Sequence, residues 1–561
     1  MLWFASFRQD EDGGKTKKRK RFGGKSAGFD SAPSRLKQCT GTLPCLPCEP
    51  LPFFYNVYYP YLDIHHEYLE VSSVFGDSQL LLPNLHFAEG MENVLNLKGS
   101  DYFEAEKQYR TNLKGLLQEG YQKYKHGFCQ LFTPTGFIVI LSADYVHEIA
   151  QLPAGTLDFH GATQKRMIGD YNWLQVGDKL PAHTILSDLT RHLVDVLPAI
   201  QEEIEYCLRH ELPDCKDQWT PGNIQKIAPR LIAIIMGRVF VGPDLNRQPE
   251  WVNNVTQFVD DVFAAGWKIK AYSHFTRRFA ARYLVAEVHR VRRQKALARH
   301  ELVPLLEDRL GSVADPDVEE HLDLLQWLVI NNSKLPQPRT LANLAELALV
   351  AYVGSTHTAA TTLTNVLLDL AARPSDIAAL HHEINENNSL SGDLSSKESF
   401  YIKNTSRLDS FMKESQRLSP AFLMTFSRIV RKPFTLSCGL TFPAGTHIIV
   451  PASTISLDAE VWESADTFDG ARFANLRSIK PENALRYQFV GTSPQAMHFG
   501  YGRNACPGRF FASMVIKAFV VKLLKRYDIK LSHERLHNTA IGSQNSAPTN
   551  AEILFKLWDG D

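Results

Sequence analysis

The side chains best suited to chemistry lie near the carboxyl end, in the segment HFGYGRNACPGRFFA. Gly500 and Gly502 permit a tight backbone bend that could lie close to a flat ligand. Pro507 suits a first helical position, so we expect Cys506 to lie at a helix N-terminus, where the helix dipole lowers the pKa of a thiol. The thiolate is the form that binds metals. A lone cysteine is more often a buried structural residue, but the glycines and the helix start favour a metal ligand here.

Two further groups of polar residues lie on expected helices. Glu414 and Arg417, in KESQR, are three apart and can pair on one helix face. Such a pair adds little stability if it is exposed. In the second group, Gly354 to Thr358 read GSTHT in the middle of a long apolar segment. Adjacent Gly and Ser are a known cause of helix kinks, so we expect a local distortion there.

The elements that must position these residues are mostly helices. Helical spacing runs from about 185 to 327 and again over 341–374, a segment with almost no charge at its centre that should run through the core. Short β-branched runs between 120 and 149 and between 426 and 450 predict small sheets, with a turn at Cys438 and Gly439. A last helix, from about 507 to 527, should finish the chain.

The carboxyl-terminal motif resembles the haem-binding loop of cytochrome P-450 enzymes. Phe499, Gly500, Gly502, Cys506 and Gly508 fill the pattern F-G-x-G-x-x-x-C-x-G. The resemblance implies a mostly α (α+β) fold, a triangular helical prism with small β-sheets. It also implies a haem b whose iron is ligated by the Cys506 thiolate, with Phe499 packed near the sulfur and Gly508 leaving room beside it.

The same resemblance assigns roles to several charged residues. Glu414, Arg417 and Arg472 would form a buried structural triad, and Arg428 would meet a haem propionate. Family members usually carry Arg or His two residues before the cysteine, where this chain has Asn504. Asn can donate a hydrogen bond but brings no charge.

The segment GSTHT resembles the place where the family carries a small residue, Gly, a variable residue, an acid and Thr above the haem. Thr358 would hydrogen-bond the iron-bound oxygen and help to deliver protons. His357 replaces the acid, and a histidine can relay protons near neutral pH. Alternatively, His357 and Thr358 merely satisfy each other in a core helix. Many fungal members that resemble the ent-kaurene oxidase branch carry a His-Thr pair at this place, so the pair favours that branch.

Composition and the amino-terminal region add few constraints. The 561 residues carry 61 basic and 61 acidic side chains, so no overall field favours nucleic acid as a partner. We expect residues 1–50 to be a flexible extension and residues 51–561 to be the catalytic domain. The extension holds a basic run, Lys15 to Arg21, and three cysteines that could hold zinc with a nearby histidine: Cys39, Cys45 and Cys48.

The expected function is that of a haem-dependent monooxygenase, which inserts one oxygen atom from dioxygen into a small apolar substrate. Expected substrate-contacting segments are 157–180, 258–272, the helix near Val353 and 422–425. By resemblance, NADPH would supply electrons through a reductase, with cytochrome b5 as a further partner, in fungal secondary metabolism of a terpenoid, indole-terpenoid, alkaloid or polyketide. The protein would associate with the endoplasmic reticulum membrane, although no spanning helix is visible. A reductase-independent isomerase, dehydratase or peroxygenase and a non-catalytic haem sensor are the alternatives.

Overall fold

The computed structural model describes residues 94–97, 101–174, 176–216, 218–314, 321–390 and 405–558, all of which belong to one compact unit. The amino-terminal extension, its basic run and the three clustered cysteines lie outside the described residues. So does most of the stretch between residue 51 and the first described helix.

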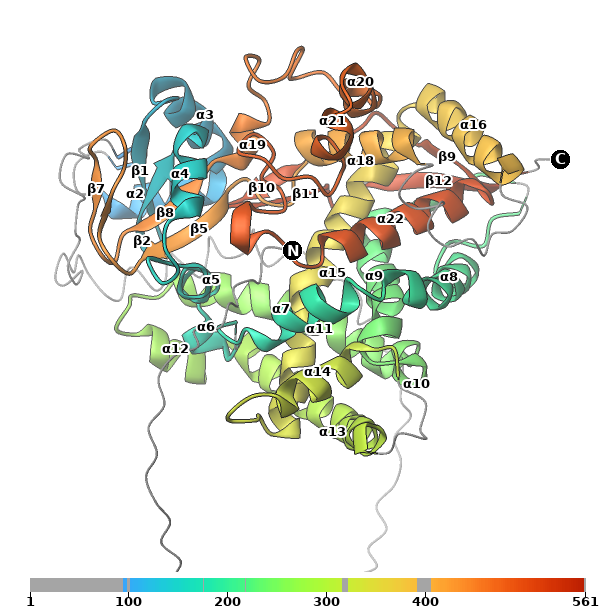
Figure 1. Cartoon of the computed structure of the whole chain (residues 1–561), viewed down its shortest axis with the longest axis horizontal. Helices are drawn as coiled ribbons and strands as arrows, with labels where there is room; N and C mark the ends of the chain where they lie inside the picture. Colours follow the sequence, from blue (N-terminus) through green and yellow to red (C-terminus); the bar gives the residue numbers. More distant parts are fainter. Residues whose placement is uncertain are drawn as a thin grey trace, which may run out of the picture. The chain divides into compact units, whose positions relative to one another are not determined.

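The described part is mostly helical with small sheets, as predicted (Figure 1). In chain order the helices are α2 (Tyr102–Thr111), α3 (Leu113–Lys123), η1 (Ala143–Tyr145), α4 (Val146–Gln151), α5 (Phe159–Met167), α6 (Gly169–Asn172), α7 (Leu180–Thr184), η2 (Ile185–Leu189), α8 (Leu193–His210), α9 (Ile224–Phe240), α10 (Pro243–Asn246), α11 (Pro249–Lys270), α12 (Arg277–Tyr283), α13 (Ala286–Ala314), α14 (Leu324–Ser333), α15 (Leu341–Ala371), α16 (Pro374–Leu390), α18 (Ser406–Leu418), α19 (Ala452–Ile455), α20 (Arg472–Ile479), α21 (Asn483–Arg486), η3 (Gly502–Asn504) and α22 (Arg509–Leu524). The strands are β1 (Phe128–Thr133), β2 (Gly136–Leu141), β3 (Leu157–Asp158), β4 (Thr220–Asn223), β5 (Thr425–Val430), β6 (Phe434–Thr435), β7 (Thr441–Phe442), β8 (His447–Val450), β9 (Tyr527–Leu531), β10 (Thr539–Ile541), β11 (Gln544–Ser546) and β12 (Glu552–Leu557).

Helix α15 is the central element and confirms the predicted core helix. Thr340 caps it by accepting a hydrogen bond from the Asn343 N–H at 3.3 Å. Its sequence is apolar on nearly every side, so it is buried along most of its length and packs against α9, α11, α13 and α18. The helix is continuous through Gly354 and Ser355. The Ser355 hydroxyl donates to Ala351 O at 2.7 Å, a bond that often bends helices. The kink itself stays a prediction.

Both predicted sheet regions are confirmed, and they join in one sheet. Its strand order is β1-β2-β8-β5-β3, in which β2 and β8 are parallel and the other neighbours are antiparallel. The β1–β2 hairpin pairs Phe128 with Leu141, and Val139 of β2 pairs with Ile448 of β8. The predicted turn before β7 is present, with Gly439 at φ +88°. The carboxyl-terminal half of the chain therefore completes a sheet begun near the amino-terminal end.

The prediction that a helix finishes the chain is wrong. Four strands follow α22, and β12 pairs with both β9 and the distant β4 in a sheet of order β4-β12-β9. Strands β10 and β11 form a separate hairpin. These strands are short, and β4 lies in the helical middle of the chain, so their pairing depends on tertiary contacts that local spacing does not encode.

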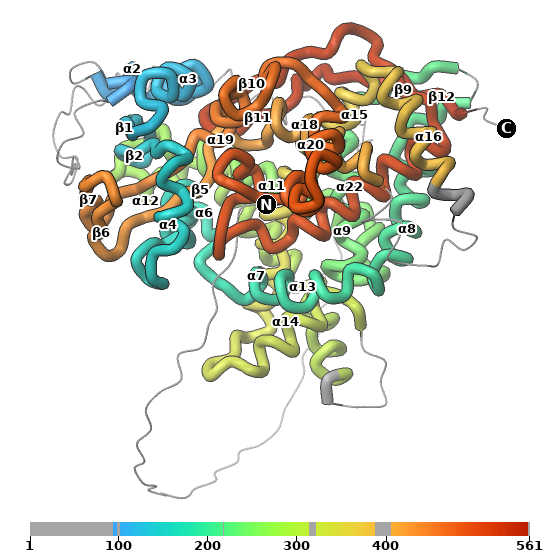
Figure 2. Tube along the Cα trace, turned by 45° about the horizontal axis from the view of Figure 1, so that its top comes forward, coloured from blue at the N-terminus to red at the C-terminus, as the bar shows by residue number. Residues whose placement is uncertain are grey.

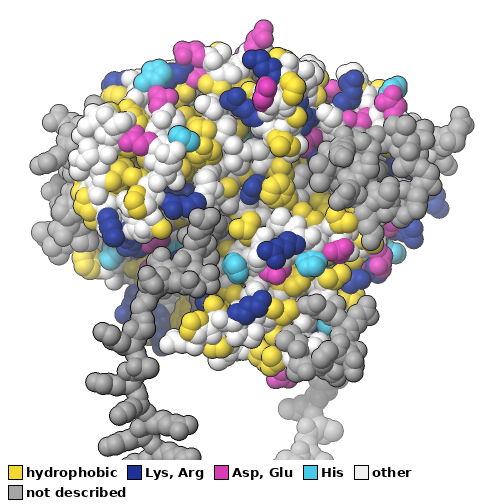
Figure 3. Space-filling view, viewed as in Figure 1, with side chains coloured by type: hydrophobic (Ala, Val, Ile, Leu, Met, Phe, Trp, Pro, Cys, Tyr) yellow, Lys and Arg dark blue, Asp and Glu magenta, His cyan; other side chains and the backbone are white. Residues whose placement is uncertain are grey.

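The two larger sheets lie on opposite sides of α15 in both views of the fold (Figures 1 and 2). Basic and acidic side chains are interspersed with apolar ones on the face drawn in Figure 3, which agrees with the balanced charge of the sequence. Within the described ranges, no helix combines the length and the apolar character needed to cross a bilayer.

Candidate functional site

Cys506 lies in a buried loop just before α22, with 2% of its surface exposed. Its backbone N–H donates to Phe499 O at 2.7 Å, so the loop folds back on itself. Gly500 and Gly502 make the bend with φ values of +72° and +67°, which L-amino acids rarely adopt. The bend that the two glycines predicted is present, and it places Phe499 in the core, edge-on to Phe489 at 5.2 Å between ring centroids.

Helix α22 begins two residues later than the sequence suggested. Its first residue is Arg509 and its N-cap is Gly508, because the chain turns at Pro507 and Gly508 before the first helical hydrogen bond. Pro507 is therefore not at the first helical position. The backbone N–H groups of Gly508 and Arg509 still donate to the Cys506 sulfur. A Cβ on Gly508 would meet only ordinary contact, 3.8 Å from Ile185, so described neighbours do not require glycine there.

Burial is the larger influence on the Cys506 thiol and raises its pKa, against the lowering effect of the two N–H groups and the Arg509 charge. A bound metal ion reverses this balance, since a coordinating thiol is deprotonated. Among the described residues, no three His, Cys, Asp or Glu side chains gather as a metal site. A single buried thiol that accepts two backbone N–H groups fits an iron whose other ligands come with an organic cofactor, as in haem.

A cavity borders the same loop and is lined by two positively charged residues. Its lining comes from α5, β5 and the cysteine loop: Phe159, Arg166, Thr425, Phe426, Ser427, Arg428, Gly500 and Asn504. Arg428 donates to Ser427 O at 2.7 Å, and its guanidinium lies 4.4 Å from the Phe426 ring centroid and 5.0 Å from that of Phe159. Burial lowers the pKa of Arg428 to about 9. The arrangement suits the edge of a haem that carries the propionates, because the lining includes two arginines and no acidic residue.

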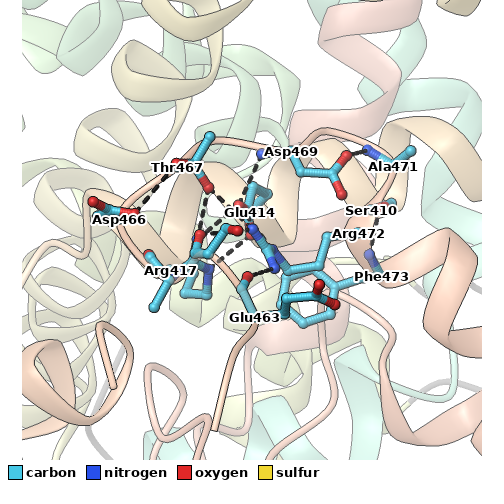
Figure 4. A network of polar contacts seen from close by, with 12 residues as sticks. Ser410, Glu414, Arg417, Glu463, Asp466, Thr467, Asp469, Ala471, Arg472 and Phe473 are labelled. Atoms are coloured by element: carbon cyan, nitrogen blue, oxygen red, sulfur yellow. Dashed lines mark hydrogen bonds and ion pairs between the residues drawn. The ribbon is translucent and has the colours of Figure 1, made fainter. Parts of the chain in front are cut away.

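The structure brings Glu414, Arg417 and Arg472 together in the core (Figure 4). Arg417 donates to both Glu414 oxygens, at 2.7 and 2.8 Å, and Arg472 Nε donates to Glu414 Oε1 at 3.1 Å. The Asp469 N–H donates to the same oxygen at 3.0 Å, and Arg417 also reaches Ser456 O at 2.7 Å. These contacts tie α18 to the segment that precedes the cysteine loop.

Sequence reasoning missed a second buried charge network beside the first. Asp409 of α18 pairs with Arg477 of α20 at 2.5 Å and with Lys517 of α22. It also accepts the Phe489 N–H at 2.9 Å. The two cations and this N–H hold the pKa of Asp409 below its usual range despite burial, which opposes them. No spacing rule could have found this set, because its members are far apart in sequence.

The middle of α15 is less buried than the residues around it. Gly354, Ser355 and His357 are only partly buried, while their helix neighbours are buried, and a Cβ on Gly354 would meet no atom within 4 Å. Thr358 donates to the carbonyls of Gly354 and Ser355 at 3.2 and 3.3 Å. Burial lowers the pKa of His357 to about 4. This places the pKa of His357 below neutral pH, and its role in relaying protons stays a prediction.

Two of the expected substrate segments, 258–272 and 422–425, meet at His357. Phe263 of α11 and Phe422, just before β5, lie 4.9 and 6.4 Å from its ring centroid. Sequence reasoning missed Gln544, whose Nε2 lies 3.5 Å from His357 Nε2 and whose Oε1 accepts a hydrogen bond from the Trp267 indole at 2.9 Å. The one sequence signal for a hairpin there is Gly542, in the turn between β10 and β11.

Comparisons with known proteins agree with this geometry. The cytochrome P450 family model matches residues 103–553. A cytochrome P450 monooxygenase of Annulohypoxylon truncatum is 34% identical over 443 residues, which are 78% of this chain and 86% of that protein. Another, of Penicillium janthinellum, is 33% identical over 456 residues, or 80% and 86%. The solved structure of cyanobacterial CYP120A1 with retinoic acid bound shares the fold, with a TM-score of 0.60 and 17% identity over 80% of this chain and 95% of that one.

The buried cysteine loop carries the family motif on a matching fold, and the family match spans most of the chain. Haem held by a cysteine thiolate is the cofactor of that family. The chain therefore belongs to the cytochrome P450 family and is a haem-thiolate monooxygenase.

Proposed function

We propose that Cys506 is the axial ligand of a haem b iron and that Phe499, Gly500, Gly508 and Arg428 hold the cofactor. The observation that carries this proposal is the buried Cys506 sulfur, which accepts hydrogen bonds from the N–H groups of Gly508 and Arg509 beside a cavity lined by two arginines. Bound there, the haem supplies the activation of dioxygen that lets one oxygen atom enter a C–H or C=C bond. The triad of Glu414, Arg417 and Arg472 keeps the adjoining scaffold in place.

Thr358 and His357 handle protons on the other side of the site in this proposal. The Thr358 hydroxyl can turn from its helix carbonyls toward a substrate or oxygen, as a donor. His357 is neutral at working pH, so it passes protons by hydrogen bonding through its ring nitrogens rather than as a stored charge. Gln544 lies close enough to fix the orientation of that ring.

The rings of Phe263 and Phe422 beside His357 favour a small apolar substrate. We place the reaction in fungal secondary metabolism, on a terpenoid, indole-terpenoid, alkaloid or polyketide, because the relatives reported above are fungal monooxygenases. The His-Thr pair supports the branch that resembles ent-kaurene oxidases. NADPH supplies the two electrons through a reductase, with cytochrome b5 as a second donor. One catalytic domain, residues 51–561, follows a flexible extension, residues 1–50.

Membrane association is supported by an exposed apolar stripe at α12. Phe275, Phe279 and Tyr283 follow one another at four-residue intervals and are 65%, 58% and 59% exposed. Exposed arginines flank them at 278 and 282, as on helices that lie in a lipid interface. We propose that this stripe rests on the cytosolic face of the endoplasmic reticulum membrane.

Vesicle binding tests the stripe. Phe279→Asp should reduce flotation with anionic phospholipid vesicles, whereas Leu485→Asp, at an apolar residue that is 76% exposed elsewhere, should not. Equal flotation of the two variants contradicts the assignment.

The reduced-minus-carbon-monoxide difference spectrum tests the haem assignment. Wild type should show the strongly red-shifted Soret band of thiolate-ligated haem, and Cys506→Ser should lose it. Cys129→Ser is the matched control, because Cys129 is another buried free thiol, 3% exposed against 2%. A band that survives in Cys506→Ser refutes the ligand assignment.

Turnover separates the alternatives. Product that forms with NADPH, reductase and dioxygen, and not with peroxide alone, supports the monooxygenase. Turnover without a reductase supports an isomerase, a dehydratase or a peroxygenase, and haem binding with no turnover of any candidate substrate supports a sensor.

A further inference from the structure

The cysteine loop supplies no cation at Asn504 to pair with a haem propionate. Haem b carries two propionate carboxylates, and buried carboxylates require charged or hydrogen-bonding partners. Asn504 lies on the cavity wall where the family usually has a cation, and it brings no charge. Arg428 of β5 supplies one cation on the same wall.

Arg166 of α5 lines the same cavity, although it is far in sequence from both Arg428 and Asn504. It arrives there because α5 packs against β5. Its guanidinium lies 5.6 Å from the centroid of the Phe422 ring, and no carboxylate among the described residues forms an ion pair with it. Burial lowers the pKa of Arg166, as expected for a cation removed from water without an anion.

The described residues that line the cavity include no acid, so the buried Arg166 cation on this wall favours an occupant that carries negative charge. The charges of Arg166 and Arg428 equal those of two propionates. We propose that Arg166 binds a haem propionate and, together with Arg428, supplies the cation that Asn504 lacks. The proposal rests on haem occupying the site beside Cys506, and it adds a cofactor-binding residue from an element that the cysteine motif does not include.

The test measures haem release from the holoenzyme into excess apomyoglobin. Arg166→Gln should accelerate release by about tenfold to hundredfold, the range expected when one hydrogen bond to a charged group is lost. Arg166→Lys keeps the charge, so its rate of haem release should lie between those of wild type and Arg166→Gln. Lys165→Gln is the matched control, since it removes one positive charge from the next residue of α5, which does not line the cavity.

Rescue distinguishes charge from packing. Asn504→Arg in the Arg166→Gln background should restore slow release, because it returns a cation to the wall of the same cavity; loss of the Phe422 contact alone would not be repaired in this way. If Arg166→Gln does not fold, Asn504→Arg in the wild-type background should slow release below the wild-type rate.

Release from Arg166→Gln at the wild-type rate overturns the proposal, as does equal acceleration by Lys165→Gln or failure of the rescue. A wild-type protein that binds no haem would instead refute the haem assignment itself. The two failures are therefore distinguishable in one experiment.

Discussion

Glu414→Gln removes the negative charge that two buried arginines share. The Glu414 side chain is fully buried, and those of Arg417 and Arg472 are 2% and 10% exposed. Each arginine keeps backbone carbonyl acceptors, among them Ser456 O for Arg417 and Thr467 O for Arg472. Neither keeps an anion, so the variant leaves two buried guanidinium charges without compensation.

The size of the effect follows from this burial. Removal of one partner from a buried ion pair costs about 3–5 kcal/mol. Because glutamine retains one acceptor oxygen, we expect the lower end, about 3 kcal/mol. Unfolding of residues 103–553 carries an entropy of roughly 0.9 kcal/mol/K at the average value per residue, so the transition temperature should fall by about 3 °C.

Scanning calorimetry of holoenzyme at equal haem content and one fixed scan rate measures this shift. Glu104→Gln is the control, because Glu104 pairs with Lys107 at the same i,i+3 spacing, but with side chains that are 44% and 50% exposed. An exposed pair contributes about 0–1 kcal/mol, so the control should shift the transition by less than about 1 °C. Equal shifts in the two variants would refute the argument from burial.

Two further changes test other parts of the fold. Gly542→Ala makes a Cβ clash with the Trp267 ring at φ +52°, so it should lower stability by about 1–3 kcal/mol and alter tryptophan fluorescence. Gly439→Ala is the control, because Gly439 also has a positive φ but has open space around its Cβ position, so only backbone strain acts there. An equal loss of stability in the two variants would contradict a clash with Trp267. Burial lowers the pKa of His447 from 6.5 to about 3. Below pH 6.5 only the unfolded state gains this proton, so acidification should reduce the free energy of unfolding by about 1.4 kcal/mol per pH unit. His447→Gln should therefore make the fall in the free energy of unfolding, measured by urea titrations between pH 7 and 5, less steep than in wild type. Equal pH dependence in the two proteins would contradict this prediction.

Local patterns in the sequence were sufficient for the motif-bearing elements. The glycines before Cys506 favoured a tight bend, and the structure has it, with positive φ at both. The uncharged run from Leu341 predicted the buried helix α15, because a helix that is apolar on all sides has to lie in a core. The E-x-x-R spacing of Glu414 and Arg417 placed both side chains on one helix face, as observed. Each of these depends on residues a few positions apart.

Tertiary structure decided what depends on distant neighbours. Spacing gave no reason for β12 to pair with β4, for Gln544 to reach His357, or for Arg166 to join Arg428 at one cavity. Burial also lowers the pKa of His357, an effect that the residue type alone does not reveal. The sequence by itself determined the local backbone and the haem-binding motif. Only the folded chain determined which charges lie away from water and which partners meet there, because desolvation and long-range contacts arise when distant segments pack together.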